Sequence, residues 1–201
     1  MIMKLIIASN NAHKVTEIRQ ILGGYFTEML TMKEAGITAD VVEDGATFEA
    51  NAVKKAEEIL RISGFDAALA DDSGLCVDAL DGAPGVYSAR FAGEGHNDAE
   101  NNAKLMRVMA DVPWEKRTCR FMTSAALARK GQKTVTATGA VEGILLTAPR
   151  GSNGFGYDPY FYYPPFDRSF AELTAEQKNS VSHRRNAMDK LRSLLEEEKA
   201  K

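Results

Sequence analysis

The pattern of hydrophobic and polar positions divides the chain into segments typical of strands and helices. Residues 4–8 (KLIIA) are apolar and β-branched, which predicts a buried central strand. Polar residues 9–11 then precede apolar positions at helical spacing, and the glycines at 23–24 end that helix. A strand, a turn and a helix in this order predict a βα unit, with SNNAHK (residues 9–14) at its turn.

The next segments follow the same logic. Residues 47–63 form a second amphipathic helix that ends at Gly64, and the apolar residues 67–70 predict a short buried strand. A third helix begins at Asn97 or Asp98, where the polar side chains suit a helix cap.

The second half of the chain predicts antiparallel strands. Two long strands are predicted at residues 117–129 and 134–147, joined by a polar hairpin turn at 130–133. The segment 149–165 is rich in glycine, proline and aromatics, and predicts a functional loop or an irregular strand. A last helix follows Ser182. The expected fold is therefore a mixed α/β protein.

Composition narrows the class of protein. The 201 residues, 44% of them hydrophobic, suffice for one domain over the whole chain, with residues 196–201 as a frayed tail. A net charge of -3 argues against a general nucleic-acid binder. Cys76 and Cys119 are the only cysteines, and with only three histidines the sequence shows no closed zinc set. One disulfide between them is an alternative, but two reduced thiols in a cytoplasmic protein are favoured. The apolar N-terminal run is too short for a membrane span.

Five polar segments have an unusual composition, and the first is SNNAHK. A helix N-terminus offers free N–H groups and a partial positive charge, and Lys14 would add a full charge. Phosphate suits such a place. The alternative is a plain helix cap with a solvent-facing lysine.

The second segment is EDGATFEANAVKKA (residues 43–56). Lys55 follows Phe48 and Ala52 on one helix face, so its stem can run inward, whereas Lys54 points outward. Glu43 lies just before this helix. The alternative is an ordinary amphipathic helix.

The third segment is LADDSGL (residues 69–75), with two adjacent carboxylates at the end of the predicted strand. Like charges raise each other's pKa unless a cation compensates. Mg²⁺ would do so, and a Mg-bound phosphate ester would bring in Lys14 and Lys55. The alternative is an acidic turn whose side chains cap the backbone.

The last two segments are GSNGFGYDPYF (residues 151–161) and QKNSVSHRRNA (residues 177–187). The glycines allow close approach of a ligand, Phe155 and Tyr157 offer flat faces for a base, and Asp158 offers an acceptor. Residues 177–187 place Lys178, His183, Arg184 and Arg185 at a helix start. Cations there oppose the helix dipole, which favours a polar or anionic ligand. The alternative for residues 151–161 is a glycine-rich loop between strands, with Phe155 and Tyr157 in the core.

Taken together, these segments resemble the inosine triphosphate pyrophosphatase family, also called the Ham1-like or non-canonical purine NTP pyrophosphatases. The matching motifs are SNNAHK, EDGATFEANAVKKA, LADDSGLCVDAL, PGVYSARFAG, GSNGFGYDPYF and KNSVSHRRNA, in the family's order and over nearly the whole chain. The resemblance implies a long central twisted sheet with flanking helices, in two lobes around a nucleotide cleft. It implies a homodimer that hydrolyses ITP, dITP and XTP to the monophosphate and pyrophosphate with Mg²⁺.

The resemblance also implies roles for single residues. Asp72 is the expected catalytic proton acceptor, and Glu43 and Asp72 match the metal positions. The triphosphate would be held by Ser9, Asn10, Asn11, Ala12, His13, Lys14 and Lys55, and Ser73 would touch the substrate. The base and sugar would meet Phe155, Gly156, Tyr157, Asp158, Lys178, His183 and Arg184.

The sequence departs from the family in two places and leaves some questions open. Ala50 and Gln177 stand where the family often has glutamate. The role of Asp71, as a second ligand or as a partner of Asp72, stays open. The alternatives for function are a pyrophosphatase for other modified nucleotides and a nucleotide-binding regulator that does not hydrolyse.

Overall fold

The computed structural model describes residues 4–24, 26–95 and 97–199, and it contains two compact units. The first unit comprises Met1–Asp72, Thr123–Gly139 and Arg184–Lys201. The second comprises Ser73–Met122 and Ala140–His183. Each unit draws on separate stretches of sequence, so each depends on contacts between distant parts of the chain.

A seven-stranded sheet has the order β2-β1-β3-β4-β5-β6-β7. β1 pairs in parallel with β2 and β3, whereas β6 pairs antiparallel with β5 and β7, so the sheet is mixed, as predicted. The strands are β1 (Lys4–Ile7), β2 (Glu28–Thr31), β3 (Ala67–Val77), β4 (Thr118–Arg129), β5 (Val135–Leu145), β6 (Phe161–Tyr163) and β7 (Arg168–Ser169).

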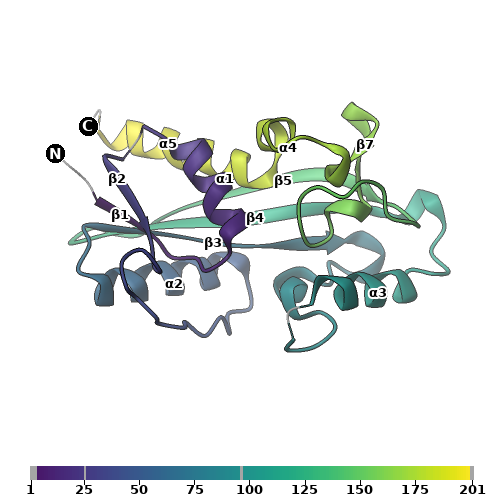
Figure 1. Ribbon diagram of the computed structural model, residues 1–201, viewed down its shortest axis with the longest axis horizontal. Coiled ribbons are helices and arrows are strands. Elements are labelled where there is room, and N and C mark those ends of the chain that lie inside the picture. The colour runs from purple at the N-terminus through teal and green to yellow at the C-terminus, as the bar shows by residue number, and fades with distance from the viewer. Residues whose placement is uncertain (1–3, 25, 96, 200–201) are drawn as a thin grey trace. The chain divides into compact units, whose positions relative to one another are not determined.

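Helices cover both faces of the strands within each unit. In the first unit α1 and α5 lie on one face and α2 on the other, and in the second unit α3 and α4 lie on opposite faces (Figure 1). The helices are α1 (Ala12–Leu22), α2 (Phe48–Ser63), α3 (Asp98–Val108), α4 (Ala175–Val181) and α5 (His183–Lys199). Across the part of the chain that the structure describes, none of them has the length and apolar character needed to cross a membrane.

The core of the first unit follows from the two-residue period of β1. Leu5 and Ile7 pack in the cluster that contains residues of α1 and α5, whereas Ile6 and Ala8 pack in the cluster on the α2 side. All four are fully buried. Burial of each larger side chain contributes about 1.5–3 kcal/mol, so β1 fastens both helical layers to the sheet.

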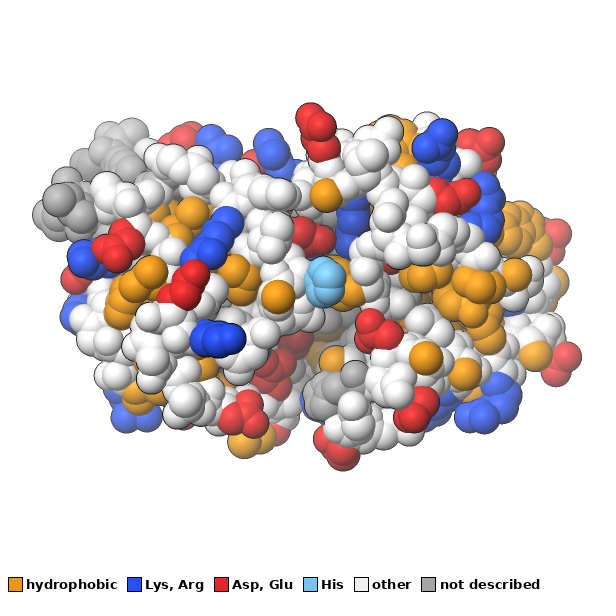
Figure 2. Space-filling model, viewed as in Figure 1, with side chains coloured by type: hydrophobic (Ala, Val, Ile, Leu, Met, Phe, Trp, Pro, Cys, Tyr) orange, Lys and Arg blue, Asp and Glu red, His pale blue; other side chains and the backbone are white. Residues whose placement is uncertain are grey.

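The core of the second unit is aromatic. Phe161 of β6 lies 4.6 Å from Phe121 and 4.7 Å from Phe170, measured between ring centroids. Leu75 of β3 and Leu105 of α3 belong to the same buried cluster. The irregular aromatic segment therefore supplies core packing as well as a loop. Charged side chains of both signs are interspersed over the visible surface (Figure 2), in keeping with the small net charge of -3.

Local patterns predicted most of these elements. Asn11, Thr47 and Asn97 each cap the helix that follows, and the turn between β4 and β5 is confirmed. The last helix is also confirmed, although it runs to Lys199 and so includes most of the predicted frayed tail; residues 200–201 lie outside the described residues.

The end predicted for the strand at 67–70 was wrong, because β3 continues to Val77. The acidic DDSG stretch (residues 71–74) lies inside the strand, so its interpretation as a turn is also wrong. The two aspartates are tolerated there because donors from other elements contact them. Strand β2 and helix α4 were not predicted at all.

Candidate active site

Asp71 and Asp72 of β3 contact different helical layers. Asp71 accepts hydrogen bonds from Arg184 of α5, and Asp72 accepts one from Asn51 of α2. Successive side chains of a strand point to opposite faces, which explains the separation. The adjacent carboxylates therefore have different surroundings.

Asp71 is the centre of a buried ion network in the first unit. The Nε and Nη2 atoms of Arg184 each lie 3.1 Å from Asp71 Oδ2, and the Lys14 Nζ lies 3.3 Å from the same oxygen. Arg184 Nη1 also donates to Glu17 of α1. Asp71 and Arg184 are almost completely buried, so each depends on the other for compensation of its charge.

The network keeps Asp71 ionised. Burial raises the pKa of this carboxyl. The charges of Lys14, Arg184 and Lys55 and the hydrogen bonds from Arg184 lower the pKa, and together they outweigh the effect of burial. The resulting pKa is well below the usual range of an aspartate. Among the described residues, Asp71 Oδ1 is buried without a hydrogen-bond partner.

Asp72 has the opposite tendency. Burial raises its pKa most, the nearby charges of Glu43 and Asp71 raise it as well, and the hydrogen bond from Asn51 and the charge of Lys14 oppose this. Asn51 Nδ2 lies 2.9 Å from Asp72 Oδ2, and Asn51 Oδ1 accepts the Gly45 N–H at 2.7 Å. Asp72 is thus a buried, oriented carboxylate with raised proton affinity, which suits a general base.

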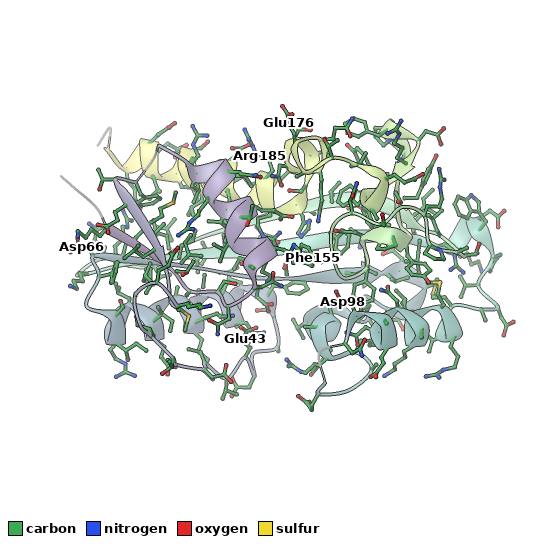
Figure 3. The ribbon with its side chains drawn as sticks, viewed as in Figure 1. Glu43, Asp66, Asp98, Phe155, Glu176 and Arg185 are labelled. Atoms are coloured by element: carbon green, nitrogen blue, oxygen red, sulfur yellow. The ribbon has the colours of Figure 1, made fainter. Side chains whose placement is uncertain are left out.

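Glu43 and Lys55 form an ion pair beside α2. Lys54, the next residue back, pairs instead with Asp44 at 2.6 Å and is more exposed. The predicted inward path of Lys55 and outward path of Lys54 therefore agree with the structure. Figure 3 labels Glu43 on the segment that leads into α2.

The start of α1 has ordinary cap chemistry with one addition. The Asn11 side chain accepts the N–H groups of His13 and Lys14 at 3.0 and 3.2 Å, and Ser9 Oγ accepts the Asn11 N–H at 3.2 Å. The addition is the ammonium of Lys14, which lies at Asp71 in the interior. The solvent-facing alternative for Lys14 is therefore wrong.

In the second unit, the glycine-rich loop at residues 151–158 is shaped by Asp158. Its Oδ2 accepts the Phe155 N–H at 2.9 Å and the Lys178 Nζ at 2.6 Å. Gly154 has φ +77°, and a Cβ there would overlap Asp158 Oδ2. Glycine is therefore required at this position both by the backbone angle and by the close approach.

Aromatic side chains of the second unit make further contacts. Lys178 Nζ lies 4.5 Å from the centroid of the Phe155 ring, and the Tyr157 hydroxyl donates to the Ser88 carbonyl at 2.8 Å. His183 stacks on Phe121 with the centroids 5.0 Å apart. Asp158, Lys178 and His183 are all buried, and the contacts of Asp158 with Phe155 and Lys178 shape the loop.

The predicted site residues fall into two groups. The first unit holds Ser9 to Lys14, Glu43, Lys55, Asp72 and Arg184, and the second holds Ser73, Phe155 to Asp158, Lys178 and His183. Arg184 was expected with the base-side residues, but its guanidinium is taken up by Asp71 and Glu17.

The contacts of Asn51 and Glu17 were not predicted from the sequence. Asn51 lies one turn before Lys55 on α2, and Glu17 lies three residues after Lys14 on α1, so helical spacing could have indicated both.

A divalent cation fits the acidic residues of the first unit. Glu43 and Asp72 offer carboxylate oxygens, and their mutual repulsion would be relieved by a cation. Among the described residues, no group of three or more histidine, cysteine, aspartate or glutamate side chains is arranged for a metal. A cation here would complete its shell with water and ligand oxygens, as Mg²⁺ does in nucleotide-dependent enzymes.

The chain is similar in sequence and in structure to known proteins. The model of the Ham1 family matches residues 5–194. The dITP/XTP pyrophosphatase of Leuconostoc mesenteroides is 47% identical over 195 residues and that of Clostridium perfringens 48% over 199, with 96–97% of each chain covered. The solved structure of the Staphylococcus aureus Ham1 protein is 38% identical, with a TM-score of 0.86, and the match covers 97% of this chain and 99% of that one.

Proposed function

The chain belongs to the Ham1 family, and we propose that it hydrolyses non-canonical purine nucleoside triphosphates, namely ITP, dITP and XTP. The products are the nucleoside monophosphate and pyrophosphate. The observation that carries the proposal is the environment of Asp72, a buried carboxylate of raised pKa that Asn51 orients. The relatives named dITP/XTP pyrophosphatase support the choice of substrates.

The charges of two lysines and the start of α1 support the phosphate contacts in this proposal. Lys14 and Lys55 bring positive charge to a ligand with several negative charges, and phosphoryl transfer requires that such charge be neutralised and held. The start of α1 adds backbone N–H groups at a helix N-terminus. The proposed contacts come from Ser9, Asn10, Asn11, Ala12, His13, Lys14 and Lys55.

Asp72 is the proposed general base. Its carboxylate takes a proton from a water molecule, whose oxygen bonds to the α-phosphorus. The bond between this phosphorus and the bridging oxygen breaks, and pyrophosphate leaves with the bonding electrons. Asn51 holds the carboxylate in one orientation, and Asp71 keeps Lys14 in place.

Mg²⁺ is the proposed cofactor, held by Glu43 and Asp72. When bound, it supplies charge neutralisation for the departing pyrophosphate. If substrate binding separates Lys55 from Glu43, Lys55 can contact the triphosphate and Glu43 can bind the metal ion. Addition of a chelator is expected to abolish turnover, and restoration by Mg²⁺ tests the assignment.

The contacts to the base and sugar are proposed from the family resemblance. The rings of Phe155 and Tyr157 can stack on the base. The proposed polar and backbone contacts come from Gly156, Asp158, Lys178 and His183. Ser73 is proposed to touch the substrate from β3. A site built to donate to the 6-oxo group of hypoxanthine or xanthine leaves a donor unpaired against adenine, which discriminates strongly. Arg184 stays in the proposed site through the resemblance alone, because ion pairs with Asp71 and Glu17 bury its guanidinium.

A substrate panel tests the function. Pyrophosphate release from ITP, dITP and XTP is compared with release from ATP, GTP, dTTP and modified pyrimidine triphosphates, with Mg²⁺ and with chelator. Faster turnover of the first three is expected, and equal rates for ITP and ATP would refute the substrate assignment. Asp72→Asn is expected to abolish turnover and retain nucleotide binding, and the exposed Glu49→Gln on the neighbouring helix serves as its control.

We also propose that the protein is a cytoplasmic homodimer. Two buried free thiols, Cys76 and Cys119, support a reducing location, and the family resemblance supports the dimer. Light scattering on the purified protein measures its mass, and a monomer would contradict the proposal.

A further inference from the structure

Gly156 is held from both sides of its backbone by one helix. Its N–H donates to Asp98 Oδ2 at 2.7 Å, and its carbonyl accepts from Asn102 Nδ2 at 2.9 Å. Asp98 and Asn102 are four residues apart on α3, so they are neighbours on one helix face. Figure 3 labels Asp98 at the start of α3 and Phe155, the residue before Gly156, in the loop.

We infer that Asp98 and Asn102 are positioning residues that hold Gly156 and so present Phe155 to the base of the substrate. These residues are 58 and 54 positions from Gly156 in sequence, and they contribute no group of their own to the proposed site. We call the pair the α3 latch. The consequence for turnover rests on the proposed function, whereas the restraint on the loop does not.

The need for a latch follows from the backbone of the loop. Gly154 and Gly156 have φ +77° and +60°, a region that glycine enters easily and also leaves easily. A glycine-rich segment loses much conformational entropy when it is ordered, so its bound shape needs external restraint. Gly156 is the one position in this pair whose Cβ would meet nothing within 4 Å, so packing does not restrain it.

Other anchors hold the flanks of Gly156. Asp158 Oδ2 accepts the Phe155 N–H on one side, and the Tyr157 hydroxyl donates to Ser88 on the other. Both anchors are part-buried or buried. The α3 latch therefore restrains the two peptide units that flank Gly156, whose rotation would change the direction of the Phe155 side chain.

The helix that carries the α3 latch is anchored by buried residues, whereas Asp98 lies at the surface. Asn101, nearly buried on α3, accepts the Ala92 N–H at 2.7 Å and donates to the Ala89 carbonyl at 3.0 Å, and Leu105 is fully buried. Asp98 itself is exposed. Its removal therefore deletes a restraint on the loop without opening the core.

The experiment uses Asp98→Ala and Asn102→Ala, with Glu100→Ala as the matched control. Glu100 is an exposed acid in the same first turn, and its one described hydrogen-bonding side-chain contact is with Asn97, so its loss alters the helix charge equally. Amide exchange of the peptide covering residues 151–158 is expected to accelerate about tenfold in the two latch variants and to stay unchanged in the control.

Kinetics then separate positioning from mere structural support. The latch variants are expected to raise KM for dITP and XTP by roughly 3- to 10-fold with kcat within about twofold, because they weaken contacts made equally in ground and transition states. Inhibition by inorganic tripolyphosphate, which has no base, should not change. Asp98→Asn retains an acceptor oxygen and is expected to restore most of the wild-type KM.

The outcomes are distinct. Unchanged exchange and unchanged KM in both latch variants would overturn the inference. An equal weakening of tripolyphosphate and dITP would overturn it too, since the effect would not be confined to the base. A wild-type protein that hydrolyses none of the purine nucleotides refutes the proposed function, and the exchange measurement then still decides whether the latch restrains the loop.

Discussion

Asp71 and Asp72 are adjacent in β3, yet one is paired with an arginine and a lysine and the other with an asparagine amide. Burial raises the pKa of both carboxyls; at Asp71 the charges of Lys14, Arg184 and Lys55 outweigh burial and the net shift is downward, whereas at Asp72 burial prevails and the net shift is upward. One is a permanent anion that holds cations, and the other is suited to accept a proton. Several expected outcomes depend on this division.

Replacement of Asp71 by asparagine should destabilise the protein by about 3–5 kcal/mol, because the buried Arg184 would keep only Glu17 as an anionic partner and Lys14 would lose its ion pair. Urea unfolding measures the change. Asp44→Asn removes an exposed carboxylate that pairs with Lys54 and should change stability little. Similar effects of the two substitutions would contradict the account of the network.

The contribution of Asp71 to stability should depend on pH in one direction. Its pKa is lower in the folded state than in the unfolded chain, so unfolding takes up a proton at acid pH. The stabilisation is complete above the ordinary aspartate pKa of about 3.9 and declines as the pH falls below it. The difference in unfolding free energy between wild type and Asp71→Asn, measured from pH 7 to pH 3, should shrink on acidification. A difference that grows would be the wrong sign.

Loss of Asn51 should move the acid limb of the activity profile to higher pH. Burial already raises the pKa of Asp72, and the Asn51 amide opposes that rise, so Asn51→Ala should raise it further. A general base must be unprotonated, so kcat/KM would decline at a higher pH than in the wild type. The measurement is the pH dependence of kcat/KM for dITP, with Glu49→Ala on the same helix as control. An acid limb that stays in place would remove Asp72 or Asn51 from these roles.

Gly154→Ala should impair the protein more than Gly131→Ala does. Both glycines have similar positive φ, +77° and +70°, so both substitutions cost about 1 kcal/mol of backbone strain. A Cβ at 154 would also displace Asp158 from Lys178, whereas one at 131 meets nothing within 4 Å. The comparison uses KM for XTP and thermal unfolding, and equal effects of the two substitutions would argue against Asp158 as the organiser of the loop.

Arg117→Met should destabilise the second unit by about 2–4 kcal/mol, since buried carbonyl groups would lose their donor. Arg117 is nearly buried, and its guanidinium donates to the carbonyls of Leu145, Met109, Val112 and Leu146. Unfolding by urea measures the effect. Arg107→Met on the exposed face of α3 is the control, and comparable losses in both would contradict a structural role for the carbonyl contacts.

What the sequence could predict was set by the range of the interactions. Helix starts at Asn11, Thr47 and Asn97 depend on hydrogen bonds within three residues, so local pattern was enough to locate them. The end of β3 depends on Arg184, 113 residues from Asp71, and no local rule predicts that a strand continues through two aspartates.

The candidate site shows the same limit. The inward course of Lys55 follows from its position on α2, and it was predicted. The burial of Arg184 among Asp71 and Glu17 depends on the packing of α5 against α1 and β3, and it was not. Motifs predicted which residues belong to the site, whereas the partner of each charged group could be identified only from the fold.

Side chains of β3 point alternately to the two faces of the sheet, and this restricts insertions and deletions in the strand. A point substitution at residues 67–70 alters one contact and leaves the others in register. Deletion or insertion of one codon there would exchange the directions of the two carboxylates, so that Asp72 would point toward Arg184 and Asp71 toward Asn51. Comparison of lineages should therefore find side chains varying in this strand while its length upstream of the aspartates stays constant.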